Sequence, residues 1–342
     1  REQLHGALRV QAVALMHGNK VRLGEVLQEQ ELLDREQVAE ILQLQAKKDD
    51  EVSLPGYEIL AKLGQGGMGA VYRARQVSMD RLVAVKVLSP KLVKDKSFVQ
   101  RFLTEARNSA KLNHPNVIRG IDVVQHGQHF FYVMEYVDGE SLRSILEAGP
   151  LPEDKAIDVT LQIAGALQHA EERRLVHRDI KPDNILVNEE DVAKLCDLGL
   201  SKHAENRAAL TDAGTVIGTP DYMSPEQARG EKNLDIRTDL YSLGITLYHM
   251  LTGTVPFRAK NPIEVLRMHL QNEPASPREH VSDVSDEVCA IVSRLLEKKA
   301  NDRYASAAEL VKVLKDLKAG RDRARILAQA QEAAAARRPR TG

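Results

Sequence analysis

The spacing of hydrophobic positions changes at two places along the chain, near residues 57 and 139. Before the first, apolar side chains recur at intervals of three and four residues, in the groups Leu23, Val26, Leu27 and Val38, Ile41, Leu42. This spacing places each group on one face of a helix, and the break at 32–34 predicts a turn between the two helices. Residues 1–50 are therefore expected to form a helical hairpin and a polar linker, either an interaction module or an inert cap.

Between the two changes the pattern alternates over short runs, which is typical of strands. We expect a helix over residues 97–112 and strands at Tyr57–Leu63, Ala70–Arg75, Leu82–Leu88, Ile118–Gln125 and Phe130–Tyr136. After Gly139 helical periodicity dominates to about residue 318. A small β-rich lobe over residues 57–137, followed by a larger helical lobe over residues 138–318, is an α+β arrangement.

Composition excludes several function classes. The net charge of the 342-residue chain is −1, so no global field draws it to nucleic acid or to a membrane surface. Aromatic residues make up 4% of the chain and tryptophan is absent, which leaves little to stack on bases. No apolar run approaches the roughly 20 residues that a transmembrane helix requires. We therefore expect no nucleic-acid partner and no membrane span in this chain.

Two further features leave alternatives open. Cys196 and Cys289 stand among apolar neighbours without metal-ligand spacing, which is typical of reduced, packed thiols. A reactive thiol is the alternative for Cys196, because it precedes Asp197. Residues 319–342 hold six arginines against two acidic residues around an Ala-rich centre. This pattern favours a helical or disordered tail over a dedicated membrane or partner site.

The run His177–Asn184, HRDIKPDN, carries the clearest chemistry. It places the carboxylate of Asp179, the ammonium of Lys181 and the amide of Asn184 within six residues. These groups can orient a hydroxyl, neutralise a phosphate and hold a magnesium ion, which is what phosphoryl transfer requires. The segment resembles the catalytic loop of the protein kinase family.

A second motif matches G-x-G-x-x-G over Gly64, Gln65, Gly66, Gly67, Met68 and Gly69. In a dinucleotide-binding fold such a turn opens a helix, whereas here it lies between two predicted strands and Lys86 stands on the next one. Backbone N–H groups in a turn without side chains can approach phosphate oxygens closely. The placement disfavours a dinucleotide fold and is similar to the phosphate-covering loop of protein kinases.

These motifs follow in order over residues 57–318, and the chain resembles the bacterial PknB-type (eukaryotic-like, Hanks-type) serine/threonine kinases. The resemblance implies that ATP and Mg²⁺ are used, with Mn²⁺ as a substitute. It implies Asp179 as the catalytic base, Lys181 at the γ-phosphate, and Asn184 and Asp197 as metal ligands. Lysine two residues after the catalytic aspartate favours serine or threonine over tyrosine as the acceptor.

The resemblance also implies the parts of an ATP pocket. Lys86 would contact the α/β-phosphates and pair with Glu105 in the active arrangement. Arg101, one helical turn before Glu105, is the competing partner for the Glu105 carboxylate. The adenine pocket would be formed by the apolar walls Leu63, Val71, Ala84 and Leu186, by Met134 at its back, and by main-chain groups of Glu135 and Val137. The alternative is that these are ordinary core and strand residues.

The segment from Asp197 to Glu226 resembles the activation segment of kinases. Thr211 and then Thr215 are the predicted phosphorylation sites, because a phosphothreonine could order the segment against Arg178. Ordinary loop threonines are the alternative. Leu198 stands where the family more often has phenylalanine, a departure that does not put activity in doubt. The residues expected to be structural are Arg178, Thr219, Glu226, Asp239 and Arg303.

The sequence thus predicts a bilobal protein kinase fold and transfer of the ATP γ-phosphoryl group to Ser or Thr of protein substrates. Autophosphorylation by self-association is part of this prediction. The alternative is a catalytically silent pseudokinase scaffold that acts through the N-terminal helical module. We expect the catalytic domain to be cytoplasmic. This expectation is compatible with membrane tethering by a segment outside this chain.

Overall fold

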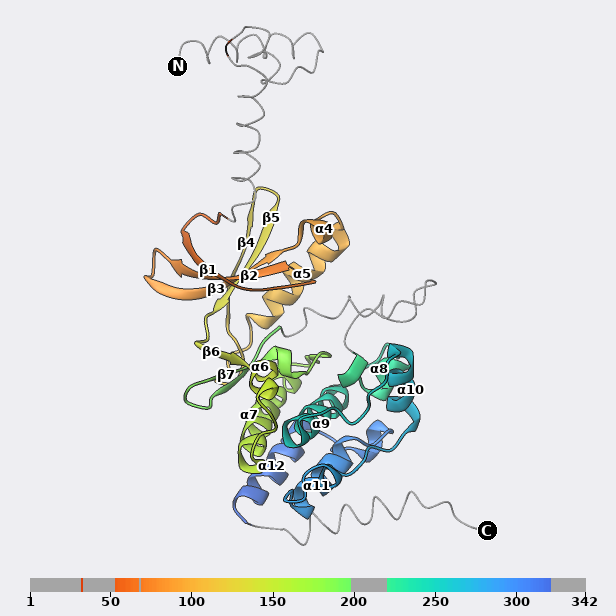
Figure 1. Cartoon of the computed structure of the whole chain (residues 1–342). Coiled ribbons are helices and arrows are strands. Elements are labelled where there is room, and N and C mark those ends of the chain that lie inside the picture. Colours follow the sequence, from red (N-terminus) through yellow and green to blue (C-terminus); the bar gives the residue numbers. More distant parts are fainter. Residues whose placement is uncertain (1–31, 33–52, 68, 198–219, 321–342) are drawn as a thin grey trace, which may run out of the picture. The chain divides into compact units, whose positions relative to one another are not determined.

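The computed structural model describes residue 32 and residues 53–67, 69–197 and 220–320 (Figure 1). The chain divides into two units, residues 1–59 and residues 60–342. The hairpin expected in residues 1–50, the threonines within residues 198–219 and the basic tail beyond residue 320 lie outside the described residues and stay predictions. No helix in the described part of the chain is long and apolar enough to cross a membrane.

A five-stranded sheet forms the first part of the described fold. Its strands are β1 (Tyr57–Gly66), β2 (Gly69–Gln76), β3 (Arg81–Leu88), β4 (Gly120–His126) and β5 (His129–Glu135). Their spatial order is β1-β2-β3-β5-β4, and β3 pairs antiparallel with both β2 and β5. Residues 83–88 of the central strand β3 are all buried. Lys86 is the one charged residue among them, so its ammonium needs a buried partner.

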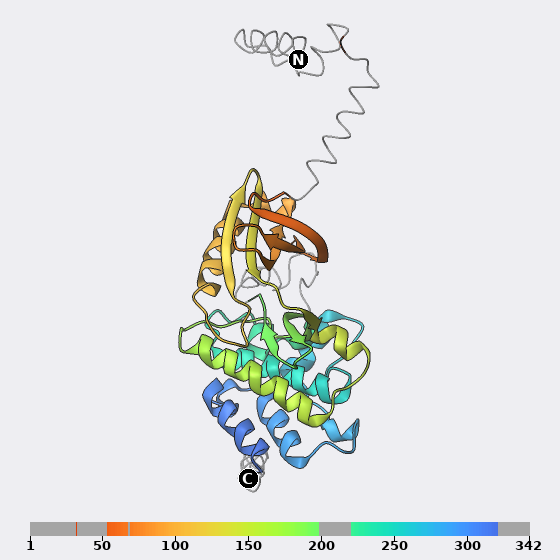
Figure 2. The ribbon, with the colours of Figure 1, turned by 90° about the vertical axis from the view of Figure 1, so that its left-hand side faces the viewer.

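Helix α5 (Lys96–Ser109) packs against this sheet (Figure 2). It begins after Asp95, whose carboxylate accepts the N–H groups of Ser97 and Phe98 at 2.9 and 3.2 Å and so caps the helix. Phe102 on its buried face meets Tyr132 of β5 edge to face, with ring centroids 6.5 Å apart. The short helix α4 (Pro90–Val93) precedes it.

The second part of the fold is helical, with one small sheet. Its helices are α6 (Leu142–Glu147), α7 (Glu153–Glu171), α8 (Pro225–Ala228), α9 (Ile236–Thr252), α10 (Pro262–Gln271), α11 (Asp286–Leu295) and α12 (Ala307–Lys318). Short 3₁₀ turns stand at Pro182–Asn184, Pro220–Tyr222, Pro277–Glu279 and Ala300–Asp302. The strands β6 (Gly139–Ser141), β7 (Ile185–Asn188) and β8 (Ala193–Leu195) pair in that order.

Helix α9 is the centre of this helical part. Its residues 238–251 are all buried, including the polar residues Asp239, Ser242 and His249, because α7, α11 and α12 pack around it (Figure 1). Gly244 permits the close approach of α11, since a Cβ there would lie 2.6 Å from Cβ of Leu295. The helix ends at Thr252 and is capped by Gly253, whose φ of 71° is the left-handed conformation that favours glycine.

The α+β architecture expected from the sequence is confirmed. Each of the five expected strands is present with bounds shifted by a few residues, and the expected helix over residues 97–112 is α5, which ends at Ser109. The sequence analysis missed α4 and the strands β6, β7 and β8. These elements have three or four residues, too few for a hydrophobic period to show.

A buried ion pair ties α8 to the last helices. Arg303 donates to both carboxylate oxygens of Glu226, at 2.7 and 2.8 Å, and its side chain is fully buried. The guanidinium also donates to the carbonyls of Glu297 and Arg237, both at 2.8 Å. Thr238 donates to Glu226 at 2.8 Å. Burial alone would raise the pKa of Glu226, but the hydrogen bonds and charge of Arg303 hold it below its usual range.

We expect the Arg303→Met variant to lose about 3–5 kcal/mol of unfolding free energy, because it leaves the carboxylate of Glu226 buried without its cation. Urea unfolding followed by circular dichroism measures this loss. The matched control is Arg229→Met, which breaks an exposed pair with Glu231 (3.0 Å) and should cost less than about 1 kcal/mol. Equal losses in the two variants would contradict the role assigned to the buried pair.

Candidate active site

The loop between α7 and β7 brings two predicted site residues, Lys181 and Asn184, to the carboxylate of a third, Asp179. Lys181 Nζ lies 2.9 Å from Asp179 Oδ2. Asn184 Nδ2 donates to the same oxygen at 2.9 Å and to the main-chain carbonyl of Asp179 at 2.7 Å. Asn184 can approach because residues 182–184 form a 3₁₀ turn that returns the chain toward Asp179. The aspartate is thus fixed in orientation by a cation and an amide.

Asp239, in the first turn of α9, holds the backbone of this loop. Its two carboxylate oxygens accept the N–H groups of His177 and Arg178, at 2.7 and 2.6 Å. Arg178 has a φ of 71°, a conformation that costs a non-glycine residue of order 1 kcal/mol or more. Gln227 supports it from the other side by donating to its carbonyl at 2.8 Å. The loop conformation is therefore imposed by the helical core.

His177 connects the loop to the chain before Asp197. Its ring is buried, and Nδ1 accepts the N–H of Asp179 at 3.2 Å while Nε2 faces the carbonyl of Cys196 at 2.9 Å. These partners assign the hydrogen to Nε2. With one nitrogen accepting and the other donating to backbone groups, His177 is a packed positioning residue.

Lys86 and Asp197 meet across the two parts of the fold. Lys86 Nζ lies 2.8 Å from each carboxylate oxygen of Asp197, although the residues are 111 positions apart in the sequence. Burial alone would raise the pKa of Asp197, but the charge and hydrogen bonds of Lys86 hold it below its usual range. Asp197 has a φ of 58°, so its backbone also adopts a sparsely populated conformation.

The expected pairing of Lys86 with Glu105 stays a prediction. Glu105 lies on α5, but its side chain is outside the part of the structure that is described. The position of Met68 in the glycine motif is outside it as well.

Five of the six apolar residues expected around adenine belong to one cluster. Ala84 and Met134 are buried in it, and Val71, Val137 and Leu186 pack against it. Leu63 is 49% exposed and does not belong to the cluster. Cys196 also packs against this cluster, and burial raises the pKa of its thiol. A raised pKa disfavours the thiolate, so the packed interpretation of this cysteine is the better one.

The glycines of the G-x-G-x-x-G motif differ in what requires them. A Cβ at Gly64, Gly66 or Gly67 would meet no atom within 4 Å. At Gly69, which has a φ of +148°, a Cβ would lie 1.8 Å from the carbonyl oxygen of Val87. Packing of β2 on β3 thus explains Gly69, whereas nothing in the described protein requires the absence of a side chain at the other three.

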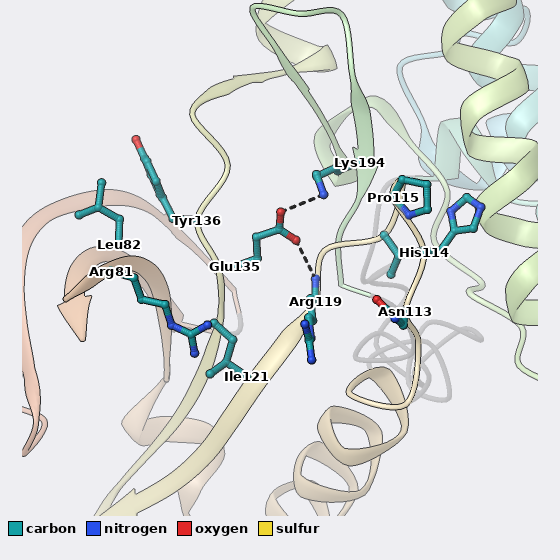
Figure 3. Close-up of a pocket in the computed structure, with 11 residues that line it drawn as sticks. Arg81, Leu82, Asn113, His114, Pro115, Arg119, Ile121, Glu135, Tyr136 and Lys194 are labelled. Atoms are coloured by element: carbon teal, nitrogen blue, oxygen red, sulfur yellow. Dashed lines mark hydrogen bonds and ion pairs between the residues drawn. The ribbon is translucent and has the colours of Figure 1, made fainter. Parts of the chain in front are cut away.

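Glu135, at the end of β5, is held by contacts that the sequence analysis missed (Figure 3). Lys194 of β8 lies 2.8 Å from its carboxylate, and the N–H of Arg119 donates to the other oxygen at 3.2 Å. The N–H of Glu135 in turn donates to the carbonyl of Arg119 at 2.9 Å. A main-chain contact from Glu135 to a nucleotide would therefore have to use its carbonyl.

Gln227, which supports the carbonyl of Arg178, was also missed. A signal for its position was present, because Ser224 and Gln227 form the S-x-x-Q pattern of a capping box, and both capping hydrogen bonds are made at α8. No pattern in the sequence marks Lys194 as the partner of Glu135.

Comparison with known proteins defines the class that this fold and site indicate. The protein kinase domain model matches residues 57–314, and the chain belongs to the protein kinase family. It is 39% identical over 259 residues to the serine/threonine-protein kinase PknB of Mycobacterium leprae, covering 74% of this chain and 42% of that protein. It is 42% identical over 262 residues to the serine/threonine-protein kinase pkn3 of Myxococcus xanthus, covering 73% and 48%.

Solved kinase domains share the fold. The kinase domain of PknI from Mycobacterium tuberculosis superposes with a TM-score of 0.63 at 27% identity, covering 79% of this chain and 98% of that one. The bilobal kinase architecture expected from the sequence is thereby confirmed. The chain spans less than half the length of the two curated relatives named above.

Because Asp239 is buried and ionisable, its contribution to the stability of the fold depends on pH. Burial raises the pKa of Asp239 to about 6, against the lowering effect of His177 and of the two N–H groups. Because this folded-state pKa lies above the ordinary one, the folded protein holds a proton that the unfolded chain releases between about pH 4 and pH 6. The stability that this proton contributes is present below about pH 4 and is lost as the pH rises through 6.

We expect the unfolding free energy of the wild type to fall relative to Asp239→Asn by roughly 2–3 kcal/mol between pH 4 and pH 7. Denaturant unfolding across this range measures the difference. The control is Asp235→Asn, because the hydrogen bond and charge of Arg237 lower the pKa of Asp235 and the difference should change in the opposite direction. Parallel curves for the wild type and Asp239→Asn would contradict the prediction.

Proposed function

We propose that residues 57–318 form a serine/threonine kinase catalytic domain, which transfers the γ-phosphoryl group of ATP to hydroxyl groups of protein substrates. The observation that carries this proposal is the convergence of Lys181 and Asn184 on Asp179, together with the bond of Lys86 to Asp197. A silent scaffold is not favoured, because Lys86, Asp179 and Asp197 are all present and engaged with charged partners.

Asp179 is the proposed base. Among the described residues, both side-chain contacts reach its Oδ2, which leaves Oδ1 to orient the substrate hydroxyl and accept its proton. Lys181 lies beside this oxygen pair and would stabilise negative charge on the transferred phosphoryl group. A base so held needs no rearrangement when the hydroxyl arrives, which is an advantage for catalysis.

Asn184 and Asp197 fit a hard divalent cation. Both hydrogen bonds of the Asn184 amide come from Nδ2, so Oδ1 is available as a ligand, and the carboxylate of Asp197 supplies further oxygens. The N–H of Cys196 donates to the main-chain carbonyl of Asn184 at 2.9 Å, which keeps the two ligand residues together. Mg²⁺, with Mn²⁺ as a substitute, would neutralise charge on the ATP phosphates there.

The phosphates are proposed to lie against the glycine motif and Lys86. Because no atom of the described residues excludes a side chain at Gly64, Gly66 or Gly67, a close ligand is the physical reason that we assign to them. Adenine would pack against the apolar cluster of Ala84, Met134 and its neighbours and would bond the main chain of Glu135 and Val137.

We expect Gly66→Ala to fold normally and to bind ATP at least about tenfold more weakly, because the new methyl group stands where phosphate oxygens approach the backbone. Titration calorimetry with Mg-ATP measures the affinity. Gly69→Ala is the contrast, because its methyl group would overlap the Val87 carbonyl and should destabilise the fold itself by more than about 2 kcal/mol. Unchanged ATP affinity in Gly66→Ala would contradict the assigned role.

Catalysis is tested by autophosphorylation with γ-labelled ATP and Mg²⁺, comparing the wild type with Asp179→Asn. We expect label on Thr211 or Thr215 of the wild type and none when Asp179→Asn is incubated alone, because the variant lacks the base. A phosphothreonine there would order the activation segment against Arg178. Label on Asp179→Asn after mixing with the wild type would establish transfer between two molecules.

Different outcomes separate the parts of this proposal. No label from the wild type, even on generic protein substrates, would favour the scaffold interpretation. Full activity of Thr211→Ala, with neither threonine modified in active enzyme, would retain the kinase and reject the activation scheme. Repeating the assay with Mn²⁺ in place of Mg²⁺ tests the substitution. Fractionation of cells that produce the protein tests the proposed cytoplasmic location of the domain.

A further inference from the structure

A pocket lies beside Glu135 (Figure 3). It has a volume of about 390 Å³ and is lined by the beginning of β3, the segment between α5 and β4, the end of β5, and Lys194 of β8. That volume is within the range of small-molecule sites, about 300–1,000 Å³. Met134 belongs to the apolar cluster, whereas the next residue, Glu135, lines this pocket, because successive side chains of a strand point to opposite faces.

Positive charge predominates in this pocket. Its lining includes the cations of Arg81, Arg119 and Lys194 and one carboxylate, that of Glu135. Lys194 and the N–H of Arg119 already bond the two oxygens of that carboxylate. Two guanidinium groups therefore remain without a carboxylate partner among the described residues. A concave surface lined by one sign of charge concentrates the field and attracts ions of the opposite sign.

The two guanidinium groups have free donors. In the described part of the chain, the side chain of Arg119 makes no hydrogen bond or ion pair, and Arg81 uses only Nε, which donates to Gln76 at 2.8 Å. Each can present a pair of N–H groups to two oxygens of one anion, the geometry in which arginine binds phosphate and carboxylate. Leu82 and Ile121 add an apolar wall, and Leu82 is 47% exposed.

We propose that this Arg119 pocket, formed by Arg81, Leu82, Arg119, Ile121, Glu135 and Lys194, binds a small organic oxyanion. The head group is a phosphate or carboxylate held by the guanidinium groups of Arg119 and Arg81, and a short apolar body packs on Leu82 and Ile121. A bound anion adds negative charge to the pocket that Glu135 lines, and Lys194 already holds the carboxylate of Glu135. Since the main chain of Glu135 is assigned to adenine, the bound anion changes ATP affinity. This consequence rests on the proposed function, whereas binding of the anion to the pocket does not.

The test is titration calorimetry of the whole chain at physiological salt with phenyl phosphate, benzoate and the neutral benzyl alcohol, each with and without saturating adenosine. We expect saturable binding of an anionic probe that persists when adenosine is bound. Tighter binding of phenyl phosphate assigns a phosphate head group and tighter binding of benzoate a carboxylate. Binding should be at least about tenfold weaker in Arg119→Gln and unchanged in Arg107→Gln, an exposed arginine of α5 outside the pocket.

Four results would overturn the proposal: no saturation by either anion at millimolar concentrations, equal binding of benzyl alcohol, displacement of the probe by adenosine, or equal affinity in Arg119→Gln and the wild type. Melting temperatures of both variants verify that they fold. We expect both to fold because the side chains of Arg107 and Arg119 are exposed. Failure of adenosine to bind, with anion binding retained, would contradict the proposed nucleotide site and leave the Arg119 pocket standing.

Discussion

The conformation of the catalytic loop depends on one buried carboxylate. Asp239 accepts two consecutive backbone N–H groups, and through them it fixes Arg178 in a conformation that the chain would not adopt by itself. From this anchor His177 reaches Asp179 on one side and the carbonyl before Asp197 on the other. Asp239 thus helps to place the carboxylates of Asp179 and Asp197, although its own hydrogen bonds go to His177 and Arg178.

The same helix also carries the second long-range tie. Arg303 bonds the Arg237 carbonyl, at the first turn of α9, while it holds Glu226, and Thr238 of that turn bonds Glu226 as well. The residues before Glu226 belong to the segment expected to receive phosphate. Because α9 is buried on all sides, it can serve as a rigid reference for both the catalytic loop and the end of that segment.

The sequence allowed prediction of the parts of the site that are contiguous. Asp179, Lys181 and Asn184 stand within one loop, so their convergence follows from local chain geometry, and the strands and α5 follow from their hydrophobic periods. The bond of Lys194 to Glu135 could not be predicted, because it depends on how two short elements without a period are placed. The difference between Gly69 and the other glycines of the motif is likewise a property of strand packing that no motif expresses.

The pair of Lys86 and Asp197 shows how a buried carboxylate can be stabilised by a cationic partner and still be able to bind a metal ion. Lys86 is buried within β3 and needs an anion, and Asp197 supplies it with two oxygens at 2.8 Å. The lowered pKa of Asp197 keeps the carboxylate ionised at neutral pH, so a hard cation can be bound there without release of a proton. Lys86 would then share Asp197 with that cation and would gain the phosphates as further anionic partners. The exchange replaces one set of charge pairs by another, which avoids the large cost of leaving either charge buried and unpaired.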